Sequence, residues 1–270
     1  MSSLIHPTAI IDRGAELGEG VSIGPYSVIG PHVKIGDRCV LHSHVCIESH
    51  TELGPENEIF QFASLGAKPQ DLKFRDEPSK LIVGARNMIR ECVTLHRGTE
   101  HGHMRTVIGD GNLLMANSHV GHDCEIGNNN VFANSAGLAG HVKIQNNVIL
   151  GGMAGIHQFC RIGSYAFLSA GAMVGHDVPP YCIAQGDRCF LRGLNLIGLQ
   201  RAGFTTEQIA DIKKTYRLLF LRGGHIRGKV PELPAELADK PHIKTMLDFI
   251  AATERGIIST PRDRHASDSE

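Results

Sequence analysis

Aliphatic residues recur every sixth position along the first two thirds of the chain. From Leu4 they fill the second place of each hexad, and the column resumes after two breaks and ends at Val174. Its first run is Ile5, Ile11, Leu17, Ile23, Ile29, Ile35, Leu41, Ile47, Leu53, Ile59 and Leu65. Neither a helix of period 3.6 nor a strand of period 2 produces this spacing. The pattern predicts an all-β solenoid, a parallel β-helix in which three hexads close each coil of roughly 18 residues.

Two segments interrupt the hexads. Residues 66–80 are polar, charged and bounded by prolines, and residues 97–106 are rich in Gly and His. We expect both to be loops ejected from the solenoid, and such loops on rigid scaffolds often carry function.

The period is lost after Pro179-Pro180, and helical signals replace it. Thr205 to Gln208 form a capping-box pattern, and apolar residues then follow at helical spacing as far as Phe220. The expected organisation is a β-helix over 1–187, a small α-helical domain over 188–258, and a polar tail over 259–270 that we expect to be disordered.

The composition limits the classes of binding partner and the cellular compartment that we expect for the protein. Lys plus Arg is 27 and Asp plus Glu is 28, which argues against nucleic-acid binding driven by bulk charge. The first residues lack the basic and apolar regions of a signal peptide, and no apolar run of about 18 residues predicts a transmembrane segment. Seven cysteines without a C-x-x-C pair are typical of reduced thiols in a cytoplasmic protein.

Histidine is unusually frequent, with 16 residues, and part of this surplus falls on one edge of the predicted solenoid. His122 is followed by Asp123. A coil of 18 residues places His141 beside them, and His157 one coil further. Three histidines are therefore expected within about two coil rises, on the order of 10 Å.

Two chemistries fit this cluster, beside the simpler possibility that the polar edge of a β-helix tolerates histidine. A histidine oriented by a carboxylate suits a general base at neutral pH. Three histidines also suit Zn²⁺, as in the β-helical carbonic anhydrases. The coils before His122 offer no further histidine, since the matching positions are Met104 and Arg86.

Several motifs together are more specific than the hexads. On them the chain resembles the UDP-N-acetylglucosamine O-acyltransferases that open lipid A biosynthesis, a family of hexapeptide-repeat transferases. The resemblance spans roughly residues 6 to 204 and rests above all on Pro69-Gln70-Asp71-Leu72-Lys73, His119-Val120-Gly121-His122-Asp123-Cys124 and His157-Gln158-Phe159. It implies left-handed coils and a homotrimer with active sites between subunits.

The resemblance also implies a reaction. An (R)-3-hydroxyacyl chain passes from acyl carrier protein to the 3-hydroxyl of UDP-N-acetylglucosamine, without a cofactor or metal. His122 matches the general base, Asp123 the residue that orients it, and the N–H of Gly140 the donor to the developing oxyanion.

Further residues match substrate contacts in this family. Ala170 occupies the place that sets acyl length, where a small residue leaves a longer channel. Ile197, Ala202 and Arg188 depart from the acidic, basic and histidine residues of the pattern, which affects the expected UDP contacts. The matched substrate-binding residues are Gln70, Asp71, Lys73, His119, His141, His157, Gln158, Asn195 and Arg201.

Three alternatives remain open from the sequence. They are the same transfer to the 3-amino analogue of the sugar nucleotide, a zinc-dependent enzyme of the carbonic-anhydrase type, and a non-catalytic β-helix that binds a partner. The sequence fixes neither the acyl chain length nor the 3-hydroxyl over the 3-amino acceptor.

Overall fold

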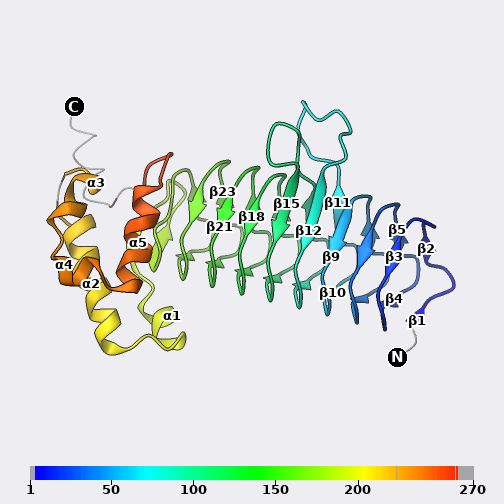
Figure 1. Ribbon diagram of the computed structural model, residues 1–270, viewed down its shortest axis with the longest axis horizontal. Helices are drawn as coiled ribbons and strands as arrows, with labels where there is room; N and C mark the ends of the chain where they lie inside the picture. The colour runs from blue at the N-terminus through cyan, green and yellow to red at the C-terminus, as the bar shows by residue number, and fades with distance from the viewer. Residues whose placement is uncertain (1–3, 223, 259, 261–270) are drawn as a thin grey trace.

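The computed structural model describes residues 4–222, 224–258 and 260. The solenoid predicted from the hexads is confirmed as a left-handed parallel β-helix with a helical region at its C-terminal end (Figure 1). Its coils carry three sheets, which run along its length.

The strands are short, most of them two residues long. The first sheet contains β1 (Leu4–Ile5), β4 (Ser22–Ile23), β7 (Val40–Leu41), β10 (Glu58–Ile59), β13 (Met88–Ile89), β16 (Leu113–Leu114), β19 (Val131–Phe132), β22 (Ile149–Leu150), β25 (Phe167–Leu168), β27 (Cys182–Gln185) and β28 (Phe190–Leu194). The second contains β2 (Ile10–Ile11), β5 (Val28–Ile29), β8 (Cys46–Ile47), β11 (Ser64–Ala67), β14 (Thr94–His96), β17 (His119–Val120), β20 (Gly137–Leu138), β23 (Gly155–Ile156) and β26 (Met173–Val174). The third contains β3 (Glu16–Leu17), β6 (Lys34–Ile35), β9 (Thr51–Leu53), β12 (Lys80–Val83), β15 (Arg105–Ile108), β18 (Glu125–Ile126), β21 (Lys143–Ile144) and β24 (Arg161–Ile162).

The aliphatic column forms the core. Leu114 pairs with Phe132 in the next coil, and Phe132 pairs with Leu150, so uninterrupted coils advance by 18 residues. All three side chains are fully buried. Each coil buries its apolar residues against its neighbours, which is how a solenoid is stabilised.

A ladder of buried asparagines also connects the coils. The Oδ1 atom of Asn57 accepts the N–H of Asn87, that of Asn87 accepts the N–H of Asn112, and the series continues to Asn130 and Val148. Each of these distances is 2.8 Å. The asparagine side chains thus satisfy backbone donors that are closed off from water.

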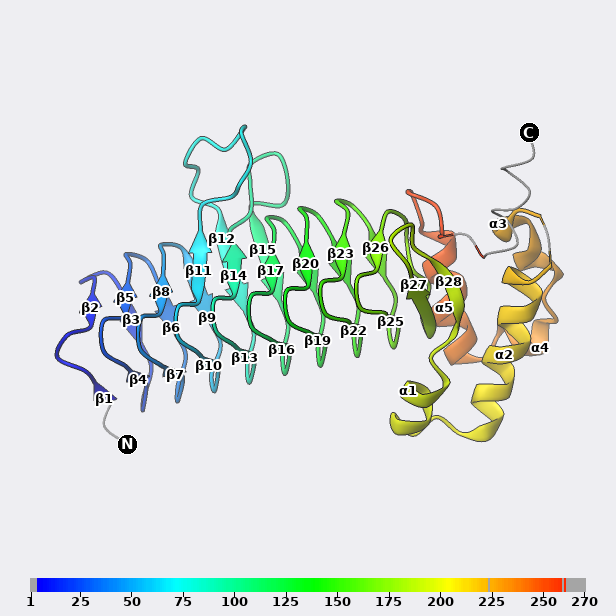
Figure 2. The same cartoon turned by 180° about the vertical axis from the view of Figure 1, so that it is seen from behind.

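Two loops leave the coil and lie side by side on one edge (Figures 1 and 2). The first loop connects β11 to β12 and spans residues 68–79, and the second connects β14 to β15 and spans 97–104. They are joined where the Glu77 carboxylate accepts the N–H of Glu100 at 2.9 Å.

The β-helix ends in a hairpin, because β28 pairs antiparallel with β27. The predicted domain boundary at residue 187 falls within this hairpin, since its second strand turns back instead of starting a new coil. Among the described residues six helical segments follow: α1 (Leu196–Arg201), α2 (Thr206–Phe220), α3 (Ile226–Lys229), η1 (Val230–Glu232), α4 (Ala235–Ala238) and α5 (Pro241–Ala251). The capping box of Thr205 and Gln208 is present at the start of α2.

Buried contacts attach the helices to the last coils. The Thr253 hydroxyl donates to the fully buried Asp177 carboxylate at 2.7 Å, and the Arg161 guanidinium lies over the Phe249 ring. The predicted tail over 259–270 lies outside the described residues, apart from Thr260. In the described part of the chain, no helix has both the length and the apolar character needed to cross a bilayer.

Candidate functional site

His122 and Asp123 lie at the corner between β17 and β18, beneath the second loop. Asp123 has a φ of 58°, in the left-handed region that the corners of this coil require and that aspartate tolerates better than most residues. The carboxylate is fully buried, while 16% of the His122 side chain is exposed. The fold thus buries the acid and leaves the imidazole accessible.

The carboxylate determines which nitrogen of His122 is protonated. His122 Nδ1 lies 2.9 Å from Asp123 Oδ2. Burial opposes ionisation of Asp123, but hydrogen bonds from His122, Thr99 and His103 outweigh it and lower its pKa to about 2. An ionised carboxylate can only accept, so Nδ1 carries the proton and Nε2 presents its lone pair.

Gly140 lies against the His122 ring from the next coil. A Cβ at this position would lie 2.5 Å from Cε1 and 2.6 Å from Nε2, so any larger residue would displace the His122 ring. Within the described residues, the Gly140 N–H has no hydrogen-bond partner. The residue that carries this unpaired donor therefore packs against the ring that carries the free lone pair.

The neighbouring histidines are held neutral. Burial, followed by the proximity of other histidines, lowers the pKa of His96 to about 4 and also lowers that of His119. Burial lowers the pKa of His141 as well, against the opposing charge of Asp123. Because these rings are uncharged at neutral pH, they add little positive charge around His122.

Only some of the predicted site residues lie together in one groove. A groove of about 1220 Å³ is lined by His122, His141 and Gln158 on the coils and by Gln70, Asp71 and Lys73 of the first loop. The Phe159 ring stacks on His141, with the ring centroids 4.5 Å apart. The 18-residue spacing correctly placed His141 beside His122, because the His141 N–H donates to the His122 carbonyl at 2.9 Å.

Other predicted residues do not line this groove within one chain: His119, His157, Asn195, Arg201 and Ala170. The Asn195 side chain caps α1 and donates to the Tyr165 carbonyl, and Arg201 is exposed in the last turn of that helix. His119 Nδ1 lies 2.7 Å from the Thr94 hydroxyl.

The zinc alternative fits the donors poorly. Among the described residues, potential ligand atoms come together at His122, Asp123 and His141, and His157 is not part of this group. The Asp123 oxygens already accept from Thr99, His103 and His122. A cation would have to displace these donors from a fully buried carboxylate.

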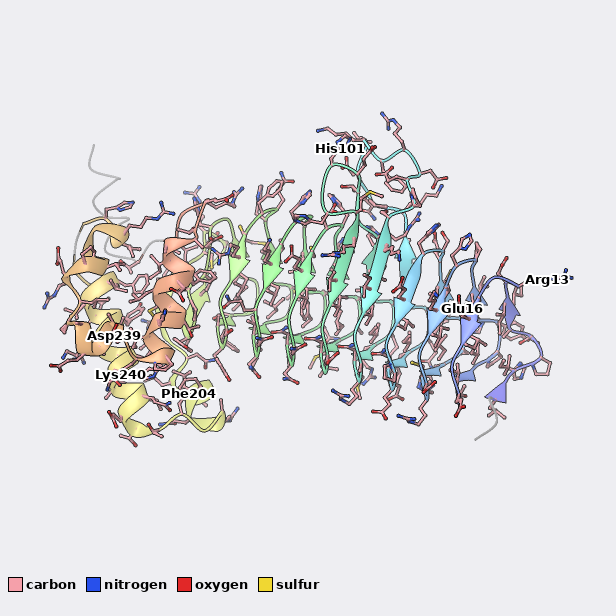
Figure 3. All side chains as sticks on the ribbon, in the orientation of Figure 1. Arg13, Glu16, His101, Phe204, Asp239 and Lys240 are labelled. Carbon is pink, nitrogen blue, oxygen red and sulfur yellow. The ribbon has the colours of Figure 1, made fainter. Side chains whose placement is uncertain are left out.

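Sequence reasoning missed several residues of the site. His101 and His103 of the second loop line the groove, and Figure 3 shows His101 on the paired loops. Lys143 and Arg161 also line it, at outward positions one coil apart in the third sheet. The sequence did carry a signal for these two cations, because Glu125, Lys143 and Arg161 follow one another at intervals of 18 residues and so stack on successive coils.

Comparisons with known proteins identify the family. The model described as "Udp N-acetylglucosamine O-acyltransferase; Domain 2" matches residues 177–258, and the bacterial transferase hexapeptide model matches 14–49 and 105–140. The acyl-[acyl-carrier-protein]–UDP-N-acetylglucosamine O-acyltransferase of Verminephrobacter eiseniae is 48% identical over 95% of this chain and 99% of its own length. The Burkholderia lata enzyme of the same name is 46% identical over 94% and 98%.

A solved structure agrees with these relatives. The UDP-N-acetylglucosamine acyltransferase of Francisella novicida superposes with a TM-score of 0.93 at 37% identity, covering 97% of this chain and 96% of that one. The chain therefore belongs to the acyl-[acyl-carrier-protein]–UDP-N-acetylglucosamine O-acyltransferase family.

Proposed function

We propose that the chain transfers an (R)-3-hydroxyacyl group from acyl carrier protein to the 3-hydroxyl of UDP-N-acetylglucosamine, the first step of lipid A biosynthesis, with His122 as general base. The observation that carries this proposal is the geometry around Nε2. A buried ionised carboxylate fixes Nδ1 as the donor, and the free lone pair faces a groove beside an unpaired N–H.

In this mechanism, Nε2 takes the proton from the sugar hydroxyl as its oxygen attacks the thioester carbon. Asp123 stabilises the imidazolium that forms. The Gly140 N–H donates to the developing oxyanion, a contribution that reaches about 3 kcal/mol at such sites. When the carbon–sulfur bond breaks, the imidazolium returns the proton to the departing thiolate.

The groove is suited to a charged sugar nucleotide. Lys73, Lys143 and Arg161 line it and supply positive charge for a diphosphate. Gln70, Asp71, His141 and Gln158 supply the polar groups that orient a sugar. The roles of Gln70, Asp71, Lys73, His141 and Gln158 follow the pattern of the family, whereas those of Lys143 and Arg161 rest on the lining of the groove alone.

We also propose that the protein works as a cytoplasmic homotrimer with the sites between subunits. Leu72, at the tip of the first loop, is 97% exposed in a single chain. A neighbouring subunit over this loop would cover it and bring further residues to the groove. That arrangement would account for His119, His157, Asn195 and Arg201, which do not line the groove of their own chain.

The small side chain of Ala170 supports a long acyl chain. A bulkier residue there would shorten the channel, so Ala170→Met is expected to shift preference toward shorter donors. Comparing the two proteins across donors of increasing length measures this effect directly.

The deciding experiment is acyl transfer from hydroxyacyl carrier protein to UDP-N-acetylglucosamine in the presence of EDTA. We compare wild type with His122→Ala, and with His44→Ala as a matched control at a corner outside the groove. The expected result is product from wild type and control, with a loss on the order of 10³-fold in His122→Ala. No transfer from wild type to the hydroxyl acceptor at any chain length would overturn the proposal, and product with only the 3-amino analogue would replace it.

A further inference from the structure

The second loop surrounds the buried end of the His122–Asp123 pair. Thr99 contributes two donors to the Asp123 carboxylate. Its hydroxyl lies 2.7 Å from Oδ2, and its N–H lies 3.1 Å from each oxygen. The N–H of His103 donates to Oδ1 at 2.8 Å. The carboxylate is therefore held by this loop as well as by His122.

The loop also seals the carboxylate from water. A Cβ on Gly102 would lie 2.2 Å from the carboxyl carbon of Asp123, so the backbone of the loop is in direct contact with the acid. Thr99 is 1% exposed and Asp123 is 0% exposed. No solvent molecule can replace a donor that is removed here without a rearrangement of the loop.

The two carboxylate oxygens of Asp123 accept hydrogen bonds from different groups. Oδ1 accepts the N–H of His103, whereas Oδ2 accepts both the Thr99 hydroxyl and His122 Nδ1. The Thr99 hydroxyl is thus the only side-chain donor, apart from His122 itself, that the described residues supply to Asp123. It limits rotation of the carboxylate and leaves one lone pair of Oδ2 for the imidazole.

From this arrangement we infer that Thr99 is a positioning residue, whose hydroxyl fixes the Asp123 carboxylate and, through it, the orientation of the His122 ring. The inference rests on the proposed role of His122 as base. It assigns a function to the second loop, which otherwise interrupts the solenoid without contributing a coil.

A change at Thr99 leaves the other charged groups near His122 in place. His141 faces it from the next coil, and His96 and His119 face it from the second sheet. The groove adds Asp71 and Lys73 from the first loop, Lys143 from the third sheet, and His101 and His103 from the second loop. Any shift in the titration of His122 on altering Thr99 therefore comes through Asp123.

The test compares Thr99→Val, which loses the hydroxyl at nearly constant shape, with Thr99→Ser, which keeps it. Thr215→Val is the matched control, because Thr215 is fully buried and its hydroxyl has no partner in the described part of the chain. Two readouts are used: the pH profile of kcat with KM for the sugar nucleotide, and the titration of the His122 ring by NMR on histidine-labelled protein. The His122 resonance is identified by its loss in His122→Ala.

Without the hydroxyl, Asp123 becomes a stronger acceptor and stabilises the imidazolium more, so the acid limb of the profile moves to higher pH. We expect Thr99→Val to move this limb, and the His122 titration, upward by about 0.5–1 pH unit. The plateau kcat should fall about tenfold with KM unchanged, and Thr99→Ser should restore both values.

Two results would overturn the inference. One is a Thr99→Val protein whose ring titration and kcat equal those of wild type. The other is equal impairment of Thr99→Val and Thr99→Ser together with lowered thermal stability, which would indicate a purely structural role. The NMR arm requires no acyl transfer. Failure of the proposed function would instead appear as no acyl transfer by wild type, and failure of the base role as full activity in His122→Ala, whatever the ring titration shows.

Discussion

Replacement of Asp123 by asparagine tests the His122–Asp123 pair more sharply than removal of the Asp123 side chain, because the second loop determines which way the new amide points. Oδ1 accepts the N–H of His103 at 2.8 Å, and it shares the Thr99 N–H with Oδ2, at 3.1 Å from each oxygen. The amide oxygen must take this place, since an NH₂ group there would face these donors. The NH₂ group then faces His122 Nδ1, which is 2.9 Å from Oδ2.

An NH₂ group in this place donates, so Nδ1 has to accept and the ring proton moves to Nε2. The lone pair needed by the base is lost from the groove. To recover it, the amide must turn over and leave the N–H of His103 without its acceptor, at a cost of about 1–3 kcal/mol, whereas the Thr99 N–H can still reach the oxygen. This cost corresponds to a roughly 5- to 160-fold smaller population of the active tautomer.

We therefore expect Asp123→Asn to lower kcat by about 5- to 160-fold with little change in thermal stability. Initial rates measure the loss, and ¹⁵N spectra of the labelled ring report the tautomer. Asp110→Asn is the control, since the next two coils already carry Asn128 and Asn146 in that place. The reasoning is refuted if Asp123→Asn retains more than a third of the wild-type rate, or if Nδ1 still carries the proton.

Two further predictions concern stability. Asn112→Ala removes one asparagine of the ladder and leaves the buried N–H of Asn130 unpaired, so it should lower the free energy of unfolding by about 2–4 kcal/mol. The control is Asn128→Ala, which should cost less than about 1 kcal/mol because the Oδ1 of Asn128 accepts an exposed N–H. Equal losses in denaturant unfolding would contradict this prediction. Because the folded pKa of His96 is about 4, below the ordinary 6.5, protonation favours the unfolded chain, and stability should fall as the pH drops from about 6.5 to 4. Asp123 adds a loss below about 3.8, as the pH falls toward its folded pKa of about 2. His96→Gln should flatten the first part of this curve in thermal melts recorded across pH, and an unchanged curve would show that His96 is not the group responsible.

The solenoid was predictable because the six-residue period recurs in every coil. The inward column from Ile23 onward is buried as expected, and Ile29 and Leu41 are each 1% exposed. Ile5 belongs to the same column but is 42% exposed. It lies in the first coil, and in the described residues no earlier coil packs against it. The pattern specifies which face a residue occupies, while burial also depends on a neighbour that the pattern does not include.

The period also placed the backbone of the site. His141 lies one coil after Asp123, and the Gly140 backbone contacts the His122 ring, as the 18-residue advance requires. The motifs of the first loop pointed to Gln70, Asp71 and Lys73, which line the groove. Asn195 and Arg201 were matched by motif alone, and no spacing argument connects α1 to the groove of the same chain.

The contacts of the second loop could not be predicted from the sequence, because its residues do not follow the six-residue period that predicted the coils. Thr99 and Asp123 are 24 residues apart, and no multiple of the coil length brings them together. Inserted residues follow their own turn geometry, and here Gly102 permits the close approach that seals the acid. A coil made only of regular hexads would leave the corner carboxylate open to water, with His122 as its main partner. The interruptions of the repeat, more than the repeat itself, therefore supply the burial and the fixed donors that a histidine–carboxylate pair needs to keep one tautomer.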